Sequence, residues 1–279
     1  MLVRLFAVLS LALTLLVSAM RQISFLYAIP LLIGFFLLIN VLFLAFLLVS
    51  SFFLPAERKA GEELAGVRFL VRVTMEWMTQ MLLIRVRVSG TEKLPEEPFV
   101  LVCNHLSRYD PIVTFYKLHE RKMAFISKQE NLQIPIAGPY IRQAGFLPID
   151  RENALRAMRT VRSAAEMIRT EGYCMGIYPE GTRSKTGQLL EFKAGAFVMA
   201  KKAGAPIVVT AIRGSFGIVR RPLWDRVIHL DILEVIPAET VVQKKPEELC
   251  EMTRECIRRH LDNGQTAPLT DDSPAPARV

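Results

Sequence analysis

The chain has 279 residues, of which 51% are apolar and 22% are charged, and its formal net charge is +8. This length accommodates one catalytic domain with an attachment segment, or two small domains. No RNP-like aromatic strand or zinc-finger pattern is present, so basic residues next to an apolar segment favour anionic lipid headgroups over nucleic acid as a partner.

The first 54 residues carry only two charged side chains and contain two apolar runs, at residues 5–20 and 23–54. At a rise of about 1.5 Å per residue, the second run is longer than the roughly 30 Å core of a bilayer requires, while the first barely reaches across. We therefore predict a membrane anchor over residues 1–56. It is either a helical hairpin that turns near Arg21 or a single span over residues 30–53 that follows an interfacial helix.

Charge at the end of the anchor predicts its orientation. The sequence Glu57-Arg58-Lys59 follows the second apolar run, and the positive-inside rule places these lysine and arginine side chains on the cytoplasmic side. A cleaved signal peptide ending near Val17-Ser18-Ala19 is an alternative for the first run. A soluble domain is expected over residues 57–264, followed by an unstructured tail at 265–279 that is rich in proline and alanine.

An amphipathic helix is predicted between residues 61 and 83, where apolar residues recur with helical spacing. Two placements fit this pattern. The helix can lie along the membrane surface, with Trp77 at the headgroup boundary and Arg68 and Arg72 facing outward. Alternatively, it packs on the core of the domain as an ordinary helix.

Short apolar segments, most of them rich in β-branched residues, alternate with helical patterns through the rest of the chain. Strands are predicted over residues 83–88, 99–103, 123–127, 174–178, 206–212 and 227–235. Helices are predicted over residues 111–118, 134–144, 153–170 and 195–202, with a closing helix over 246–261 that stops at Asn263-Gly264. This alternation predicts an α/β domain with a mixed, largely parallel sheet flanked by helices.

No metal site is expected. The four cysteines, at positions 103, 174, 250 and 256, form no C-x-x-C pair and have no histidine spacing suited to zinc. They are expected to be reduced thiols in the core or in helices of a cytoplasmic domain. The histidines at positions 119, 229 and 260 are too scattered in the sequence to suggest a metal cluster.

The stretch Asn104-His-Leu-Ser-Arg-Tyr-Asp-Pro111 sets a histidine and an aspartate five positions apart after a predicted strand. Neither a helix nor a strand brings side chains at this spacing together, so His105 and Asp110 can meet only where the chain turns. Pro111 suits the first turn of a helix, which makes Asp110 a candidate N-cap as well as a partner for the imidazole. Such a histidine at the carboxyl end of a strand is suited to general-base catalysis, and a purely structural pair is the alternative.

A second polar segment, Tyr178-Pro-Glu-Gly-Thr-Arg-Ser184, also follows a predicted strand. Gly181 permits close approach of the backbone, and Arg183 offers forked donors that match a phosphate group. Lys193 lies nearby, and the stretch Gly145-Phe-Leu-Pro-Ile-Asp-Arg151 places another arginine after a short apolar run. These segments indicate either an anion-binding site or polar turns with solvated cations.

Taken together with Ala205-Pro-Ile-Val-Val-Thr210, the order and spacing of these motifs resemble the glycerolipid acyltransferase family, most closely the bacterial 1-acyl-sn-glycerol-3-phosphate acyltransferases. The resemblance covers about residues 85–215, and the first two motifs are its most specific parts. It implies an α/β fold in which the His–Asp motif lies at the start of a helix.

The resemblance also implies roles for individual residues. His105 would deprotonate the acceptor hydroxyl group, and Asp110 would orient its imidazole. The glycerol phosphate of the acceptor would be bound by a group of residues in which Arg183 contacts the phosphate, namely Glu180, Gly181, Thr182, Arg183, Arg151 and Lys193.

The implied chemistry needs no cofactor, metal or covalent intermediate. Acyl-CoA or acyl carrier protein carries an activated thioester, so the enzyme has to position a hydroxyl group, remove its proton and stabilise an oxyanion. The sequence accordingly lacks the G-x-S-x-G, H-E-x-x-H and G-x-x-x-x-G-K-[ST] patterns of other enzyme classes.

The implied product is phosphatidic acid, made by acylation of the sn-2 hydroxyl of 1-acyl-sn-glycerol 3-phosphate at the cytoplasmic side of the cell membrane. Bulky Arg108 and Tyr109 between the histidine and the aspartate leave glycerol 3-phosphate or another lysophospholipid open as the acceptor. A third interpretation is a membrane-anchored protein that binds anionic lipids without catalysis, which leaves the His–Asp turn without a role.

Overall fold

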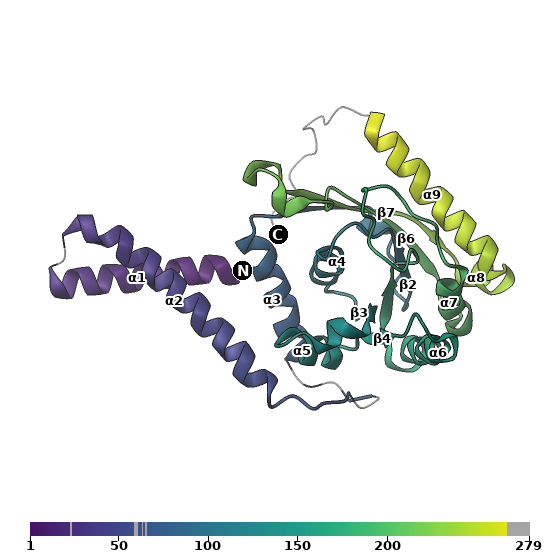
Figure 1. The fold of residues 1–279 in the computed structure, drawn as a ribbon, viewed down its shortest axis with the longest axis horizontal. Helices are drawn as coiled ribbons and strands as arrows, with labels where there is room; N and C mark the ends of the chain where they lie inside the picture. Colours follow the sequence, from purple (N-terminus) through teal and green to yellow (C-terminus); the bar gives the residue numbers. More distant parts are fainter. Residues whose placement is uncertain (23, 59–60, 63, 65, 267–279) are drawn as a thin grey trace.

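A seven-stranded sheet forms the centre of the fold (Figure 1). The computed structural model describes residues 1–22, 24–58, 61–62, 64 and 66–266. The strands are β1 (Arg85–Ser89), β2 (Val100–Cys103), β3 (Met123–Lys128), β4 (Leu147–Ile149), β5 (Cys174–Ile177), β6 (Ile207–Arg213) and β7 (Val227–Ile236). Their order is β1-β7-β6-β2-β5-β3-β4, and only the β6–β7 pair is antiparallel. The predicted mixed, largely parallel sheet is confirmed.

Helices cover both faces of this sheet (Figure 1). On one side, α3 (Val67–Met81), α4 (Asp110–Lys117) and α5 (Ala137–Gln143) pack together, next to α1 (Leu2–Arg21) and α2 (Phe25–Ser51). On the other side lie α6 (Ala154–Glu171), α7 (Val198–Ala203), α8 (Ala238–Gln243) and α9 (Pro246–Thr266). Apolar strand residues such as Val100, Leu101 and Val208 are fully buried between the two layers, as expected of strands covered on both faces.

The strand register explains why distant motifs meet. Val102 of β2 is level with Ile177 of β5, and these parallel neighbours end at the same edge of the sheet. β3 and β4 continue the same arrangement beyond β5. The loops that follow β2, β5 and β4 contain the His–Asp turn, the Glu180 segment and Arg151, so all three leave the sheet at its carboxyl edge, where open α/β sheets bind their ligands.

Three elements differ from the sequence-based expectations. β4 contains Pro148 and was not predicted, because proline is tolerated only on an edge strand and the sequence does not reveal which strand is the edge. The short helix α8 was also missed. α9 continues through Asn263 and Gly264, so the predicted stop there is wrong; an Arg258–Asp262 ion pair of 2.8 Å supports this last part of the helix. Of the predicted tail, residues 267–279 lie outside the described residues.

The N-terminal segment forms a two-helix hairpin that projects from the domain (Figure 1). α1 ends where Gln22 adopts a left-handed conformation with φ of 51°, and Ser24 is the N-cap of α2. The two helices pack against each other, and Phe6 of α1 meets Phe43 of α2 edge-on. Each helix is long enough and apolar enough to cross a membrane. Of the two predicted arrangements, the structure contains the hairpin.

α3 packs on the domain. Its indole at Trp77 donates a hydrogen bond to Asn40 Oδ1 of α2 at 2.8 Å. Arg68 turns towards the protein and donates to the backbone carbonyls of Met123 and Ala144, at 2.6 and 2.9 Å. The expectation that Arg68 faces outward is wrong. Its guanidinium group instead donates to two backbone carbonyl oxygens of the domain, because backbone groups left unpaired inside a protein are costly. The core face of the helix consists of Val67, Val71, Val73, Met75 and Thr79.

The four cysteines are free thiols, as predicted. Cys103 and Cys174 are buried at the end of β2 and the start of β5, and Cys250 and Cys256 are half-buried in α9. Burial raises the pKa of each of these thiols, which keeps them protonated at neutral pH.

We expect Gly176→Ala to destabilise the domain by about 1–3 kcal/mol, because overpacking of a rigid core forces side chains and backbone to shift. A Cβ at Gly176 in β5 would overlap the ring of Phe125, which is only 1% exposed and has no room to move. Chemical unfolding in detergent measures the loss. Gly195→Ala is the matched control, because a Cβ there meets nothing within 4 Å; equal midpoints for both variants would contradict the prediction.

Candidate active site

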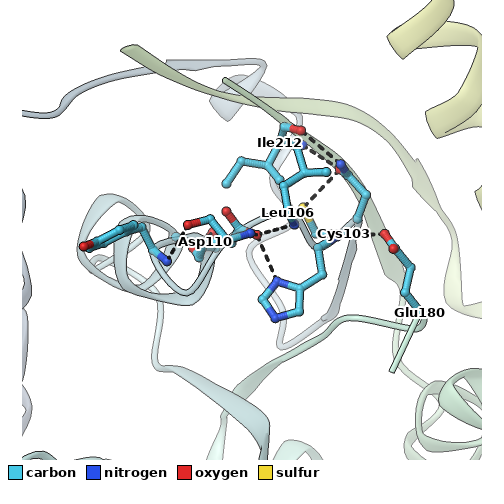
Figure 2. A network of polar contacts seen from close by, with 10 residues as sticks. Cys103, Leu106, Asp110, Glu180 and Ile212 are labelled. Atoms are coloured by element: carbon cyan, nitrogen blue, oxygen red, sulfur yellow. Dashed lines mark hydrogen bonds and ion pairs between the residues drawn. The ribbon is translucent and has the colours of Figure 1, made fainter. Parts of the chain in front are cut away.

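The segment after β2 is fixed by the side chain of Asn104. This residue is fully buried, and its amide bridges to β6: Oδ1 accepts from the Ile212 N–H at 2.8 Å, and Nδ2 donates to the Ile212 carbonyl at 3.0 Å (Figure 2). The chain leaves the sheet here because the Asn104 side chain, and not the backbone of β2, makes these two hydrogen bonds with β6. Sequence reasoning missed this role, although an asparagine that ends an apolar strand and precedes the histidine is a usable signal.

His105 and Asp110 meet at a turn, as the spacing predicts. The imidazole Nδ1 lies 2.9 Å from Asp110 Oδ2 (Figure 2). Since an ionised carboxylate only accepts, Nδ1 carries the proton and donates it, which leaves Nε2 as the atom with a free lone pair. The His105 side chain is 16% exposed while Asp110 is completely buried, so the ring reaches towards solvent from a carboxylate held inside the protein.

Asp110 does not cap α4. The helix begins at Asp110 itself with Tyr109 at the N-cap position, and no side chain caps it. Oδ2 of Asp110 instead accepts from the backbone N–H groups of Leu106 and Ser107, each at 2.7 Å, in addition to the imidazole. The predicted N-cap role is therefore wrong, because the carboxylate turns back to satisfy the preceding turn rather than the donors of the helix that follows.

The imidazole is also held from the side. The ring of His105 stacks on Tyr178, with centroids 4.2 Å apart and an interplanar angle of 21°. Tyr178 stacks in turn on Phe125 of β3 at 5.9 Å. Burial raises the pKa of the Tyr178 phenol well above its ordinary value, so this ring stays neutral. A half-buried aromatic ring and a buried carboxylate together restrict the orientation of the proposed base.

Glu180 connects the second motif to the first. Its Oε1 accepts a hydrogen bond from the backbone N–H of His105 at 2.8 Å (Figure 2). The backbone N–H of Ser184 donates to the carbonyl of His105, also at 2.8 Å. Glu180 is only 3% exposed. This carboxyl therefore contacts the backbone of the histidine, and the acceptor-binding role that the resemblance implies for it stays a prediction.

Burial raises the pKa of the Glu180 carboxyl from 4.5 to about 7; the His105 N–H opposes this rise and the charge of Asp110 adds to it. The folded state thus holds the proton more tightly than the unfolded state. Its contribution to stability is fully present below pH 4.5 and is lost as pH rises through about 7.

We accordingly expect Glu180→Gln, which cannot ionise, to gain stability relative to the unmodified protein as pH rises from about 5 to 8, by about 1–2 kcal/mol after allowance for solvent screening. Unfolding midpoints of both proteins across this range measure the difference. Parallel pH profiles would contradict the expectation, and Glu191→Gln is a control at an exposed carboxyl.

The remaining predicted residues of the second motif lie at the surface of the same loop. Gly181 has φ of 69°, and Lys193 Nζ lies 3.2 Å from the point where a Cβ on Gly181 would sit. The Lys193 backbone N–H donates to the Pro179 carbonyl at 3.0 Å, which holds the lysine over the loop. Thr182 and Arg183 are exposed. Within the described part of the chain, the Arg183 guanidinium has no hydrogen bond or ion pair and is available to a ligand.

Arg151 lies at the same edge but farther along it. It follows β4, which is separated from β5 by β3, so at about 4.8 Å per strand it starts roughly 10 Å from the Glu180 segment. Its side chain is exposed. The structure thus brings His105, Asp110, Glu180, Gly181 and Lys193 together and places Thr182, Arg183 and Arg151 on the solvent side of that cluster.

The sequence profile of the Acyltransferase family matches residues 85–213. This segment runs from β1 to the end of β6 and contains both motifs of the site. Residues 85–213 are an acyltransferase-family domain. The solved structure of the 1-acyl-sn-glycerophosphate (LPA) acyltransferase from Thermotoga maritima has a similar fold, with a TM-score of 0.64 at 23% identity over 96% of this chain and 100% of that chain.

Curated relatives of this chain carry consistent names. It is 27% identical over 207 residues to the 1-acyl-sn-glycerol-3-phosphate acyltransferase of Saccharomyces cerevisiae, which covers 72% of this chain and 68% of the relative. It is 32% identical over 169 residues to the alpha form from Homo sapiens, which covers 60% and 57%. It is 30% identical over 126 residues to the Haemophilus influenzae enzyme, which covers 45% and 52%. For the last two, the chain spans little more than half of the relative.

Proposed function

We propose that this protein transfers an acyl chain from a thioester donor, acyl-CoA or acyl carrier protein, to the sn-2 hydroxyl of 1-acyl-sn-glycerol 3-phosphate. The observation that carries the proposal is the His105–Asp110 pair, with Nδ1 donating to a buried carboxylate and Nε2 facing outward at the carboxyl edge of the sheet. The names of the curated relatives support the choice of acceptor.

The reaction follows from the protonation state of this pair. Nε2 of His105 takes the proton of the acceptor hydroxyl as its oxygen attacks the thioester carbonyl, and the Asp110 carboxylate stabilises the imidazolium that forms. The tetrahedral intermediate then expels the thiolate, which takes the proton from Nε2 of His105 and leaves as a thiol, and the ester remains. The chain supplies the base and its carboxylate partner for these steps.

The cations around the histidine fit an acceptor that carries a phosphate monoester. Lys193 is held over Gly181, and Arg183 extends from the same loop without a partner in the described chain. Arg151 is a further cation along the edge. A phosphate bound by this group would place a hydroxyl of the same glycerol backbone near Nε2 of His105, because both motifs leave adjacent strands.

The α1–α2 hairpin is proposed to anchor the enzyme in the membrane, with the domain on the cytoplasmic side. Arg58, just beyond the hairpin, forms an ion pair with Glu171 at the end of α6, which ties the segment after the anchor to the domain. An acceptor with one long acyl chain partitions into the same membrane, so the anchor would bring enzyme and substrate to one surface.

Turnover by the purified protein tests this proposal. The assay offers 1-acyl-sn-glycerol 3-phosphate, glycerol 3-phosphate and a lysophospholipid with a headgroup as acceptors, each with acyl-CoA and with acyl carrier protein. We expect phosphatidic acid from the first acceptor. Preferred use of another acceptor would show that the proposed substrate is wrong and identify the correct one. Liposome binding without turnover would favour the anionic-lipid-binding alternative.

We expect Arg183→Ala to raise the KM for the acceptor by about 10- to 100-fold while kcat changes much less, since a charge-assisted contact of this kind contributes about 1.5–3 kcal/mol. Initial rates across a range of acceptor concentrations separate the two constants. The control is Arg259→Ala at an exposed position of α9, far from the site. An unchanged KM in the Arg183 variant would remove this residue from the phosphate pocket.

A further inference from the structure

The loop between β6 and β7, residues 214–226, presents several large apolar side chains to solvent. Trp224 is 79% exposed and Leu223 is 52% exposed, values unusual for such residues on a water-facing loop. The loop also contains three arginines against one aspartate. Aromatic and aliphatic side chains interleaved with arginine are typical of segments that lie in a membrane interface.

The loop is held by the buried side chain of Ile218 and by hydrogen bonds to its backbone. Arg226 donates to three backbone carbonyls, those of Leu82 at 2.8 Å, Val219 at 2.9 Å and Arg221 at 3.1 Å. Arg85 of β1 likewise donates to the carbonyl of Trp224. These arginines satisfy the polar backbone of the loop, and a backbone satisfied from within can enter apolar surroundings at little cost.

The loop lies on the side of the domain from which the anchor projects (Figure 1, green segment above α3). Its contact with Leu82 places it at the end of α3. The N-terminal ammonium group of α1 reaches Glu76 in the same half of α3, at 2.7 Å. Exposed Leu83 continues the apolar surface between α3 and the loop. The loop is therefore continuous with the base of the proposed anchor.

The loop also borders the candidate active site. It leaves the carboxyl end of β6, the neighbour of β2, at the edge where His105 lies. The ring of Phe216 packs on Gly187, since a Cβ added to Gly187 would lie 3.3 Å from Phe216 Cδ1. Gly187 belongs to the chain that continues from Arg183. A surface that holds the loop therefore also constrains the segment that continues from Arg183.

We propose that residues 216–224 form a second membrane contact, which sits in the interface of an anionic bilayer beside the α1–α2 hairpin. Trp224, Leu223 and Val219 enter the headgroup boundary, and the exposed guanidinium of Arg220 meets lipid phosphates. This inference rests on the proposed membrane anchor and goes beyond the proposed reaction. It assigns the loop the role of setting the height of the active site above the lipid.

Tryptophan fluorescence tests this contact, because the chain has only two tryptophans. Trp77→Phe leaves Trp224 as the single reporter, and Trp77 packs edge-on against Phe43, a contact that phenylalanine retains. The full-length variant is reconstituted in vesicles of phosphatidylcholine and phosphatidylglycerol, with and without bromine on the acyl chains. We expect blue-shifted Trp224 emission that is quenched in the brominated vesicles, as for an indole at the interface.

Two reference variants lack both natural tryptophans. Leu37→Trp in α2 reports insertion of the anchor and should be quenched, whereas Val242→Trp, at an exposed position on the far side of the domain, should not. Quenching of Leu37→Trp without quenching of Trp224 would overturn the loop contact and leave the anchor standing. No quenching at either position would overturn both. Trp224 emission that is shielded from acrylamide but insensitive to bromine would instead indicate contact between copies of the chain.

This measurement does not depend on catalysis, so it separates failure of the membrane contact from failure of the proposed reaction. As a second readout, Trp224→Ser with Leu223→Ser should lower turnover of a long-chain acceptor embedded in vesicles at least several-fold. Turnover of a short-chain acceptor in solution should not change. Equal losses with both acceptors would overturn the inference, because they would indicate damage to the site itself.

Discussion

Replacing His105 with alanine is expected to lower kcat by about 10²- to 10⁴-fold, the range attributed to a positioned general base. Neither of the two carboxyl groups next to the histidine can take over the role. Asp110 is completely buried, and the Glu180 carboxyl faces the backbone of residue 105 rather than solvent. Rates of acyl transfer to 1-acyl-sn-glycerol 3-phosphate at saturating donor measure the effect.

The same variant should keep its fold and its affinity for the acceptor. The bonds from Glu180 and to Ser184 use the peptide groups of residue 105, which alanine retains. We therefore expect KM for the acceptor to stay within about threefold, because the cations of the phosphate pocket are untouched. Retention of more than a tenth of the original kcat in purified protein would reject His105 as the base. His229→Ala is a matched control outside the site.

Asp110→Asn is expected to lower kcat by about 10²- to 10³-fold and to destabilise the fold by about 1–3 kcal/mol, since it removes a buried charge that accepts three hydrogen bonds. The donors are the imidazole of His105 and the N–H groups of Leu106 and Ser107. An amide oxygen can still accept, but more weakly, and it no longer balances the charge of an imidazolium. Turnover and thermal unfolding of the same preparation give the two numbers.

Comparison of the two substitutions distinguishes a role of Asp110 in positioning His105 from a purely structural role. His105→Ala should affect kcat alone, whereas Asp110→Asn should affect both kcat and the unfolding temperature. Asp225→Asn, at an exposed position of the β6–β7 loop, should leave both unchanged. An Asp110 variant that unfolds earlier but retains full turnover would make this carboxylate purely structural.

Local sequence patterns predicted the parts of the site that depend on neighbours in the chain. The five-residue spacing and Pro111 were enough to predict that His105 and Asp110 meet at a turn. The same reasoning gave Asp110 the wrong hydrogen-bond partners, because capping preferences describe isolated helices and do not include the donors of the preceding turn. Alternation of apolar strands with helices likewise predicted the sheet but not the edge position of β4.

The hydrogen bonds that fix the backbone around His105 could not be predicted from the sequence. Glu180 reaches His105 across 75 residues, and Asn104 reaches Ile212 across 108. These contacts depend on β2 lying between β5 and β6, a strand order that no local pattern encodes. The contact between Glu180 and the His105 backbone therefore becomes visible only when the neighbouring strand is known.

Both peptide groups of His105 are bonded to the loop that carries Arg183, through Glu180 and Ser184. The proposed base and the proposed phosphate pocket are therefore joined by two direct hydrogen bonds. We expect a phosphate bound on this loop to lie at a set distance from the imidazole, so that acceptor recognition and proton transfer depend on the same geometry. We therefore expect the enzyme to select acceptors by the distance between their phosphate and hydroxyl groups. A longer or shorter acceptor would place its hydroxyl away from the imidazole.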